Sequence, residues 1–141
     1  VAIVTSTRPW LADKGLFLRK GFDLVETAPP SFELVVKQFK DAPLPSFPKN
    51  WDQRLKSYGD GVTVVYTKQC PYIPEAVEAV LDVAKEAGIR AEAVELKSAR
   101  DVQQKAPTPY GTFSIVFNGK LVSSLYMLKE DLLKRLNETL S

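Results

Sequence analysis

Cys70 is the residue whose type and position most directly suggest chemistry, because the chain has one cysteine and no histidine. Without histidine, the chain cannot build a Ser-His-Asp or Cys-His nucleophile or an imidazole metal site. One cysteine likewise excludes an internal disulfide and a multi-thiolate zinc site. Any chemistry must therefore use Cys70, carboxylates, hydroxyls, Lys and Arg side chains, or a partner.

The surroundings of Cys70 favour a thiol at the start of a helix. An apolar, β-branched run over Val62–Tyr66 predicts a strand, and apolar residues at helical spacing predict a helix over Glu75–Ala87. Pro71 and Tyr72 directly follow the cysteine. The positive end of a helix favours a thiolate over a thiol, so this junction is a reasonable place for thiol chemistry.

The remaining pattern of the second half indicates a mixed α/β domain. After the first strand and helix we expect a strand over Ile89–Leu96 and a helix capped by Ser98 and ending at Lys105. Asn118-Gly119 predicts a hairpin of Thr112–Phe117 and Leu121–Leu125, and leucines at helical spacing predict a final helix over Glu130–Leu140. The expected order is β-α-β-α-β-β-α.

That order, with Cys-Pro-Tyr at the first helix, resembles the thioredoxin/glutaredoxin fold over roughly residues 61–140. Two departures from the family pattern affect function. The second position of a C-x-x-C pair is Ile73, so no dithiol site is present. The cis-proline that family members place opposite the cysteine would fall near Gly111, so it is either shifted to Pro109 or missing.

The resemblance implies a groove beside Cys70, formed by Pro71 and Tyr72 and by Pro109, Tyr110 and Gly111. Its functional interpretation is a shallow substrate or peptide site; the alternative is a constrained entry into the next strand. Cys70 itself has three interpretations: monothiol exchange through mixed disulfides, a sensor or substrate-side thiol, or a cysteine left without chemistry at a helix cap. Glu75 and Glu78 are expected to complement the helix dipole rather than to act as an acid/base pair.

The first 40 residues carry a different pattern. Val1–Val4 predicts a strand, a helix is expected from Pro9 through Lys20, and two strands follow over Phe22–Glu26 and Phe32–Phe39. Lys20-Gly21-Phe22 and Ala28-Pro29-Pro30-Ser31-Phe32-Glu33-Leu34 resemble the C-terminal part of a GNAT-family N-acetyltransferase. Together with the Cys-Pro-Tyr domain, they resemble GNAT proteins that carry a YoaP-like domain.

This resemblance implies a parent protein that uses acetyl-CoA and transfers its acetyl group to an amine. In that family the pyrophosphate sits on a glycine-rich turn at a helix N-terminus. None of the seven glycines here has that spacing, and the segment Trp10–Lys20 has no tyrosine to serve as general acid. We therefore predict that this chain alone does not bind acetyl-CoA and is inactive by itself, with no cofactor or metal site of its own.

The expected fold class is thus α/β: the last strand-helix-strand-strand portion of a GNAT fold, then a thioredoxin-like domain. The expected domains are residues 1–40, a proline-rich linker with a short helix over 41–60, and residues 61–141. The alternatives are a thioredoxin-like monothiol module that uses Cys70, or a non-enzymatic domain for dimerisation or substrate binding.

Composition restricts the possible partners. The net charge is +2, with 19 basic and 17 acidic residues and no local basic surplus, which argues against a nucleic-acid footprint. The apolar runs are far shorter than the roughly 18 residues of a membrane span. We expect a cytoplasmic protein whose partner is an upstream GNAT core in the same polypeptide, with a homodimer as a further possibility.

Overall fold

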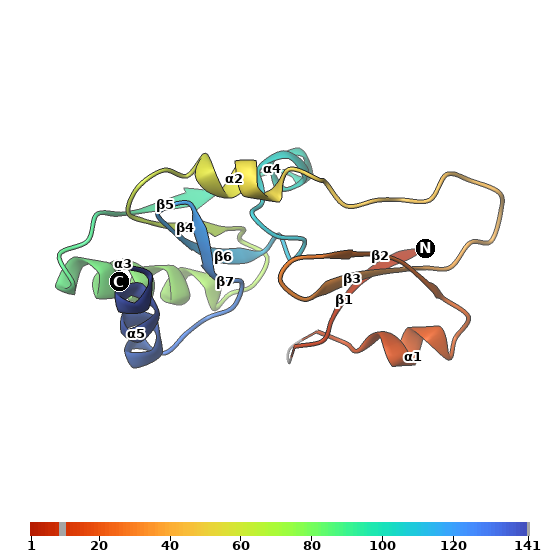
Figure 1. Cartoon of the computed structure of the whole chain (residues 1–141), viewed down its shortest axis with the longest axis horizontal. Coiled ribbons are helices and arrows are strands. Elements are labelled where there is room, and N and C mark those ends of the chain that lie inside the picture. Colours follow the sequence, from red (N-terminus) through yellow and green to blue (C-terminus); the bar gives the residue numbers. More distant parts are fainter. Residues whose placement is uncertain (9–10, 141) are drawn as a thin grey trace. The chain divides into compact units, whose positions relative to one another are not determined.

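The computed structural model describes residues 1–8 and 11–140, and it divides into two compact units between Lys49 and Asn50. Each unit contains one β-sheet (Figure 1), which confirms the mixed α/β class. No helix in the described part of the chain is both long and apolar enough to cross a bilayer.

The first unit is a three-stranded antiparallel sheet with the order β1-β3-β2. Its strands are β1 (Ala2–Ser6), β2 (Asp23–Ala28) and β3 (Phe32–Val36). Every residue of β3 is buried, as expected for the central strand. The strand ends at Val36 rather than at Phe39 as predicted, and the Phe39 side chain is exposed.

The helix of this unit is shorter than predicted. Helix α1 covers Lys14–Leu18, because the Asp13 side chain caps it by accepting a hydrogen bond of 2.7 Å from the Gly15 amide. The expected start at Pro9 lies outside the described residues. The rings of Phe17 and Phe22 pack edge to face with their centroids 5.6 Å apart, and this contact fixes the connection from α1 to β2.

Two glutamates attach other segments to the two faces of this sheet. Glu33 on β3 pairs with Lys14 of α1. Glu26 on β2 accepts a hydrogen bond of 2.7 Å from the Phe47 amide and pairs with Lys49. Because Glu26 lies opposite Leu34 in the register, it faces the side of the sheet opposite to Glu33. The proline-rich segment is therefore held against the first unit.

The second unit is built on a four-stranded sheet with the order β5-β4-β6-β7. Strands β4 (Val62–Tyr66) and β5 (Ala91–Glu95) are parallel, whereas β6 (Phe113–Phe117) and β7 (Lys120–Ser123) extend it antiparallel. Asn118 and Gly119 have φ of 50° and 71°, the left-handed conformations that the predicted Asn-Gly turn requires.

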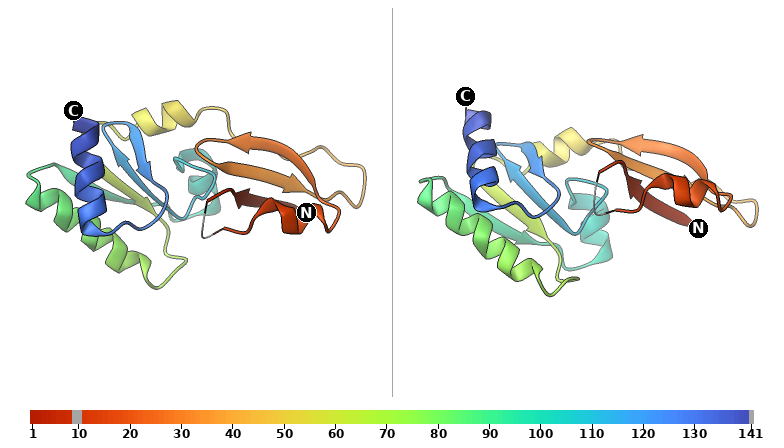
Figure 2. Two further views of the ribbon diagram at one scale, coloured as in Figure 1. Left: turned by 60° about the horizontal axis from the view of Figure 1, so that its bottom comes forward. Right: turned by 90° about the horizontal axis from the view of Figure 1, so that it is seen from below.

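Helices cover both faces of this sheet (Figures 1 and 2). Helices α3 (Ile73–Glu86) and α5 (Lys129–Leu140) pack on one face, and α2 (Trp51–Lys56) and α4 (Ala99–Lys105) on the other. Each face of the sheet has its own hydrophobic core, because successive side chains of a strand point to opposite faces. Val62 and Val64 point toward α3, and Val65 points toward α2 and α4. The order β4-α3-β5-α4-β6-β7-α5 is the order of elements expected from the sequence.

Helix α2 belongs to the second unit because one arginine attaches it to α4. The Arg54 guanidinium donates hydrogen bonds to the carbonyls of Ala106 at 3.1 Å and Gln103 at 2.6 Å. Its charge also lies over the Trp51 ring, 5.0 Å from the centroid. Burial lowers the pKa of Arg54, against an opposing contribution from Tyr58. The arginine thus satisfies carbonyls at the C-terminal end of α4.

Candidate functional site

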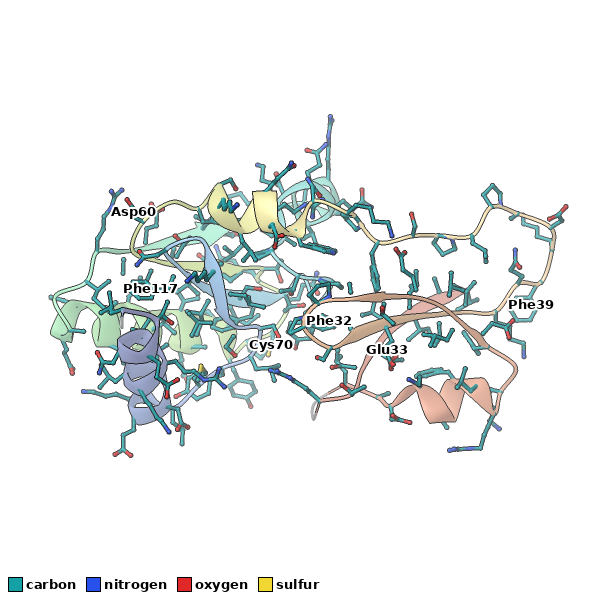
Figure 3. The ribbon with its side chains drawn as sticks, in the orientation of Figure 1. Phe32, Glu33, Phe39, Asp60, Cys70 and Phe117 are labelled. Carbon is teal, nitrogen blue, oxygen red and sulfur yellow. The ribbon has the colours of Figure 1, made fainter. Side chains whose placement is uncertain are left out.

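Cys70 lies in the loop from β4 to α3, at one end of the second sheet, whereas Phe117 lies toward the other end (Figure 3). Two backbone hydrogen bonds fix the end of β4. The Leu96 amide donates to the Tyr66 carbonyl over 2.7 Å, and the Thr67 amide donates to the Thr112 carbonyl over 2.9 Å. The Cys70 carbonyl then accepts a hydrogen bond of 3.2 Å from the Ile73 amide. These bonds place the thiol at the start of α3.

Helix α3 begins at Ile73, two residues earlier than predicted. Pro74 lies in its first turn, where a missing amide hydrogen costs no hydrogen bond, and Tyr72 is the cap residue. Ile73 is buried in the core between the sheet and the helices. The position that a resolving cysteine would occupy therefore contributes packing.

A second loop, between α4 and β6, brings Tyr110 to the same place. Gly111 has a φ of +68°, and a Cβ there would lie 2.8 Å from the Val102 side chain, so this turn requires glycine. The Thr112 hydroxyl donates to the Tyr110 carbonyl over 3.2 Å and tightens the turn. In the described residues the one cis peptide bond joins Pro29 to Pro30. The bond before Pro109 is trans, so of the two predicted alternatives the cis-proline is missing rather than shifted to Pro109.

A third segment, after β7, completes the site. The Ser123 hydroxyl donates to the Leu125 carbonyl over 2.9 Å and accepts from the Leu125 amide over 3.0 Å. This local turn ends β7 at Ser123, two residues earlier than predicted, because the hydroxyl competes with the strand ladder. It directs Leu125 and Tyr126 toward the Cys70 loop.

These three segments line an open cavity of about 500 Å³. Its lining consists of apolar and aromatic side chains, a thiol, two hydroxyl residues and one carboxylate: Cys70, Tyr72, Ile73, Glu75, Ala76, Tyr110, Thr112, Phe113, Ser124, Leu125 and Tyr126. Such a volume and lining are typical of small-molecule sites. The predicted residues Cys70, Tyr72 and Tyr110 meet there, whereas Pro71, Pro109 and Gly111 are not in the lining.

The sequence reasoning missed the contribution of the segment after β7. Tyr126 and Leu125 are distant from Cys70 in the chain, and no local pattern indicates that they approach it. The available signal was the Ser123-Ser124 pair shortly before Tyr126, because serine hydroxyls favour a local turn at the end of a strand. Glu75 was assigned to the helix dipole; it lies in the first turn of α3 and also lines the cavity. Glu78, one turn later, does not line it.

The charge of the site comes from Glu75, since no lysine or arginine among the described residues lines the cavity. The nearby Lys68 lies 3.0 Å from the Glu95 carboxylate, and this hydrogen bond raises the pKa of Lys68. Within residues 1–8 and 11–140, no group of three or more His, Cys, Asp or Glu side chains could hold a metal ion. The geometry therefore suits a ligand with an apolar body.

Comparison with known proteins gives one informative match. The chain is 30% identical over 130 residues to a protein of Bacillus subtilis (strain 168) named "Uncharacterized N-acetyltransferase YoaP". The matched region covers 92% of this chain and 51% of that protein, so the chain spans about half the length of the curated relative it matches. No protein-family model matches the chain, and no solved structure matches it.

Proposed function

We propose that this chain is the second half of a longer GNAT-type N-acetyltransferase, which transfers the acetyl group of acetyl-CoA to an amine. The observation that carries the proposal is the similarity to the Bacillus subtilis N-acetyltransferase, because it extends across 92% of the chain and thus across both units. A match confined to one unit would support only a shared module.

The first unit has an architecture that suits the end of a larger sheet. It contains the strand-helix-strand-strand sequence of the GNAT resemblance, and its outer strand β1 has no further strand partner in the described residues. An open β edge presents unpaired amides and carbonyls that another strand of the same polypeptide can satisfy. In this proposal an upstream GNAT core extends the sheet at β1.

The reaction itself is a simple displacement. The amine nitrogen attacks the thioester carbonyl of acetyl-CoA, the carbon–sulfur bond breaks, and CoA leaves as a thiol while the amine loses a proton. Pyrophosphate binding by such enzymes needs free amides at a helix N-terminus.

The described residues do not fit the pyrophosphate of acetyl-CoA. The five described helices each begin with their own acids, either at the cap or in the first turn: Asp13, Asp52, Glu75, Asp101, and Glu130 with Asp131. These carboxylates would repel a diphosphate and already complement the helix dipoles. This supports the prediction that the chain alone does not bind acetyl-CoA, and we assign that site to the upstream core.

For the second unit we infer a thioredoxin-like domain without dithiol chemistry. The sheet order β5-β4-β6-β7, the parallel β4–β5 pair and the cysteine between β4 and α3 support the fold. The buried Ile73 in place of a second cysteine favours a binding role. The domain would present its cavity to the substrate of the acetyltransferase.

Calorimetry with acetyl-CoA tests the proposal. The longer polypeptide that includes the upstream core should bind acetyl-CoA, and the 141-residue chain should give no saturable heat under the same conditions. Micromolar binding by the 141-residue chain would overturn the assignment of the site to the upstream core. Failure of the longer polypeptide to bind acetyl-CoA would overturn the acetyltransferase proposal itself.

A further inference from the structure

The cavity beside Cys70 has a charge that selects among ligands. Its lining includes one carboxylate, Glu75, and no basic side chain in the described part of the chain. The acidic character continues along α3, where Glu78 and Asp82 follow on exposed positions. An anionic ligand would meet repulsion at this site, and a cationic one would meet attraction.

The lysines on the adjacent segments do not offset this charge. Lys68, two residues before Cys70, is paired with Glu95 at the end of β5. Lys129, at the start of α5, is paired with Glu86 at the end of α3. Each of these cations is thus directed to another carboxylate, which leaves Glu75 as the charged group of the cavity.

Aromatic rings add a second feature suited to a cation. Tyr72 and Tyr126 are 74% and 56% exposed, and Tyr110 is half-buried, yet all three line the cavity. Exposed tyrosines around a concave apolar site are characteristic of ligand recognition rather than of core packing. The face of a tyrosine ring attracts a cation, so the rings and Glu75 favour the same charge.

We propose that this cavity binds a small organic cation: a primary amine carried on an apolar aliphatic or aromatic body. The ammonium would lie near Glu75, and the apolar body would pack on Leu125, Phe113 and the tyrosine rings. The identification of this amine as the acyl acceptor rests on the proposed function. Binding itself requires neither acetyl-CoA nor the upstream core.

Titration of the 141-residue chain with three probes of similar shape tests the charge selectivity. The probes are the cationic phenethylamine, the neutral phenethyl alcohol and the anionic 3-phenylpropionate. Binding is measured by calorimetry or by the NMR shifts of the tyrosines. We expect phenethylamine to bind about tenfold more tightly than the alcohol, and the carboxylate to bind most weakly. Equal affinities for all three probes would overturn the proposal.

Two matched variants locate the selectivity. Glu75→Gln should weaken phenethylamine binding about tenfold without changing binding of the alcohol. Glu78→Gln removes the same charge from the same helix outside the cavity, and should change phenethylamine binding less than twofold. Similar effects of the two variants would contradict a specific role for Glu75. Circular dichroism and a melting curve verify that each variant is folded.

Cys70 supplies an independent reporter, because it is the only cysteine in the chain and it lines the cavity. Phenethylamine at saturation should slow alkylation of Cys70 by iodoacetamide severalfold, whereas 3-phenylpropionate at the same concentration should not. Unchanged alkylation with bound amine would show that the amine binds elsewhere and would overturn the assignment. Because no acetyl-CoA is present, this failure would leave the acetyltransferase proposal standing.

Discussion

The ammonium of Lys68 lies 3.0 Å from the carboxylate of Glu95, although one residue is in the Cys70 loop and the other ends strand β5. Tyr66 and Glu95 are the last paired residues of the parallel β4–β5 register. The ion pair therefore links the chain just after β4 to the end of β5. The pair directs the cation nearest to Cys70 in the sequence toward the strand. The charge of the cavity therefore depends on a contact outside it.

Replacing Glu95 should change binding at a cavity that Glu95 does not line. Glu95→Gln leaves the Lys68 cation unpaired, so we expect about two- to threefold weaker binding of phenethylamine. Added salt should reduce the difference, because exposed charges are screened. Glu92→Gln is the control, since Glu92 is exposed on the same strand. Equal effects of the two substitutions would contradict the role of the ion pair.

Tyr58 predicts a loss of stability in alkaline solution. Burial raises the pKa of Tyr58 from 10.0 to about 12, against an opposing contribution from Arg54. The phenol therefore stays neutral in the folded state while it ionises in the unfolded state. Its contribution to stability is complete below pH 10 and is lost as the pH rises from 10 to 12. We expect a decrease of roughly 1 kcal/mol over this interval, less than the full shift would give, because the side chain is only about half-buried.

The comparison of wild type with Tyr58→Phe isolates this effect, because every other ionisable group is the same in both proteins. Urea denaturation at several pH values should give two curves whose separation shrinks above pH 10. The variant also lacks the hydrogen bond of 2.6 Å from the Tyr58 hydroxyl to the Lys105 carbonyl, which adds a constant offset at lower pH. Parallel curves up to pH 12 would contradict the assignment.

Arg54 should be the largest single polar contribution to the attachment of α2. Arg54→Met keeps the aliphatic stem but leaves the carbonyls of Gln103 and Ala106 without this donor, and we expect about 2–4 kcal/mol lower stability. Arg54→Lys should lose less, because one donor remains near them. Lys56→Met on the same helix should change stability by under about 0.5 kcal/mol. Chemical denaturation of the second unit measures all three.

Two glycines distinguish backbone conformation from steric contact. Gly59 and Gly61 both have positive φ, but a Cβ at Gly61 would lie 2.5 Å from the Arg90 carbonyl oxygen, whereas nothing lies within 4 Å of a Cβ at Gly59. Gly59→Ala should cost about 1 kcal/mol, the usual penalty for a left-handed residue. Gly61→Ala should cost about 2–4 kcal/mol, because the β4 entry must also shift. Equal melting temperatures for the two variants would be inconsistent with this contact.

Local patterns predicted most elements of the second unit, because each is determined by residues close in sequence. Val62–Tyr66 is apolar and β-branched on both faces, and its position as an inner strand between two helical layers requires that composition. The sequence also predicts the Asn118-Gly119 turn, because two successive residues with positive φ strongly favour an Asn-Gly pair.

The errors occurred where a side chain competes with the regular backbone pattern. Asp13 caps α1 at Lys14 and so shortens the expected helix, and the Ser123 hydroxyl ends β7 in a local turn. The cavity was predicted only in part for a different reason. Tyr126 approaches Cys70 through the tertiary fold, and the position of Glu75 in the lining depends on where α3 starts.

The most direct test of acceptor binding in the cavity is release of the CoA thiol by the longer polypeptide. It is measured with saturating acetyl-CoA and increasing phenethylamine. We predict that release depends on the amine. Glu75→Gln should raise the KM for the amine about tenfold, with the KM for acetyl-CoA within about twofold of wild type, whereas Glu78→Gln should behave as wild type. Amine-dependent release that Glu75→Gln leaves unchanged would contradict acceptor binding in the cavity. No amine-dependent release with any primary amine tested would contradict the proposed acetyltransferase function.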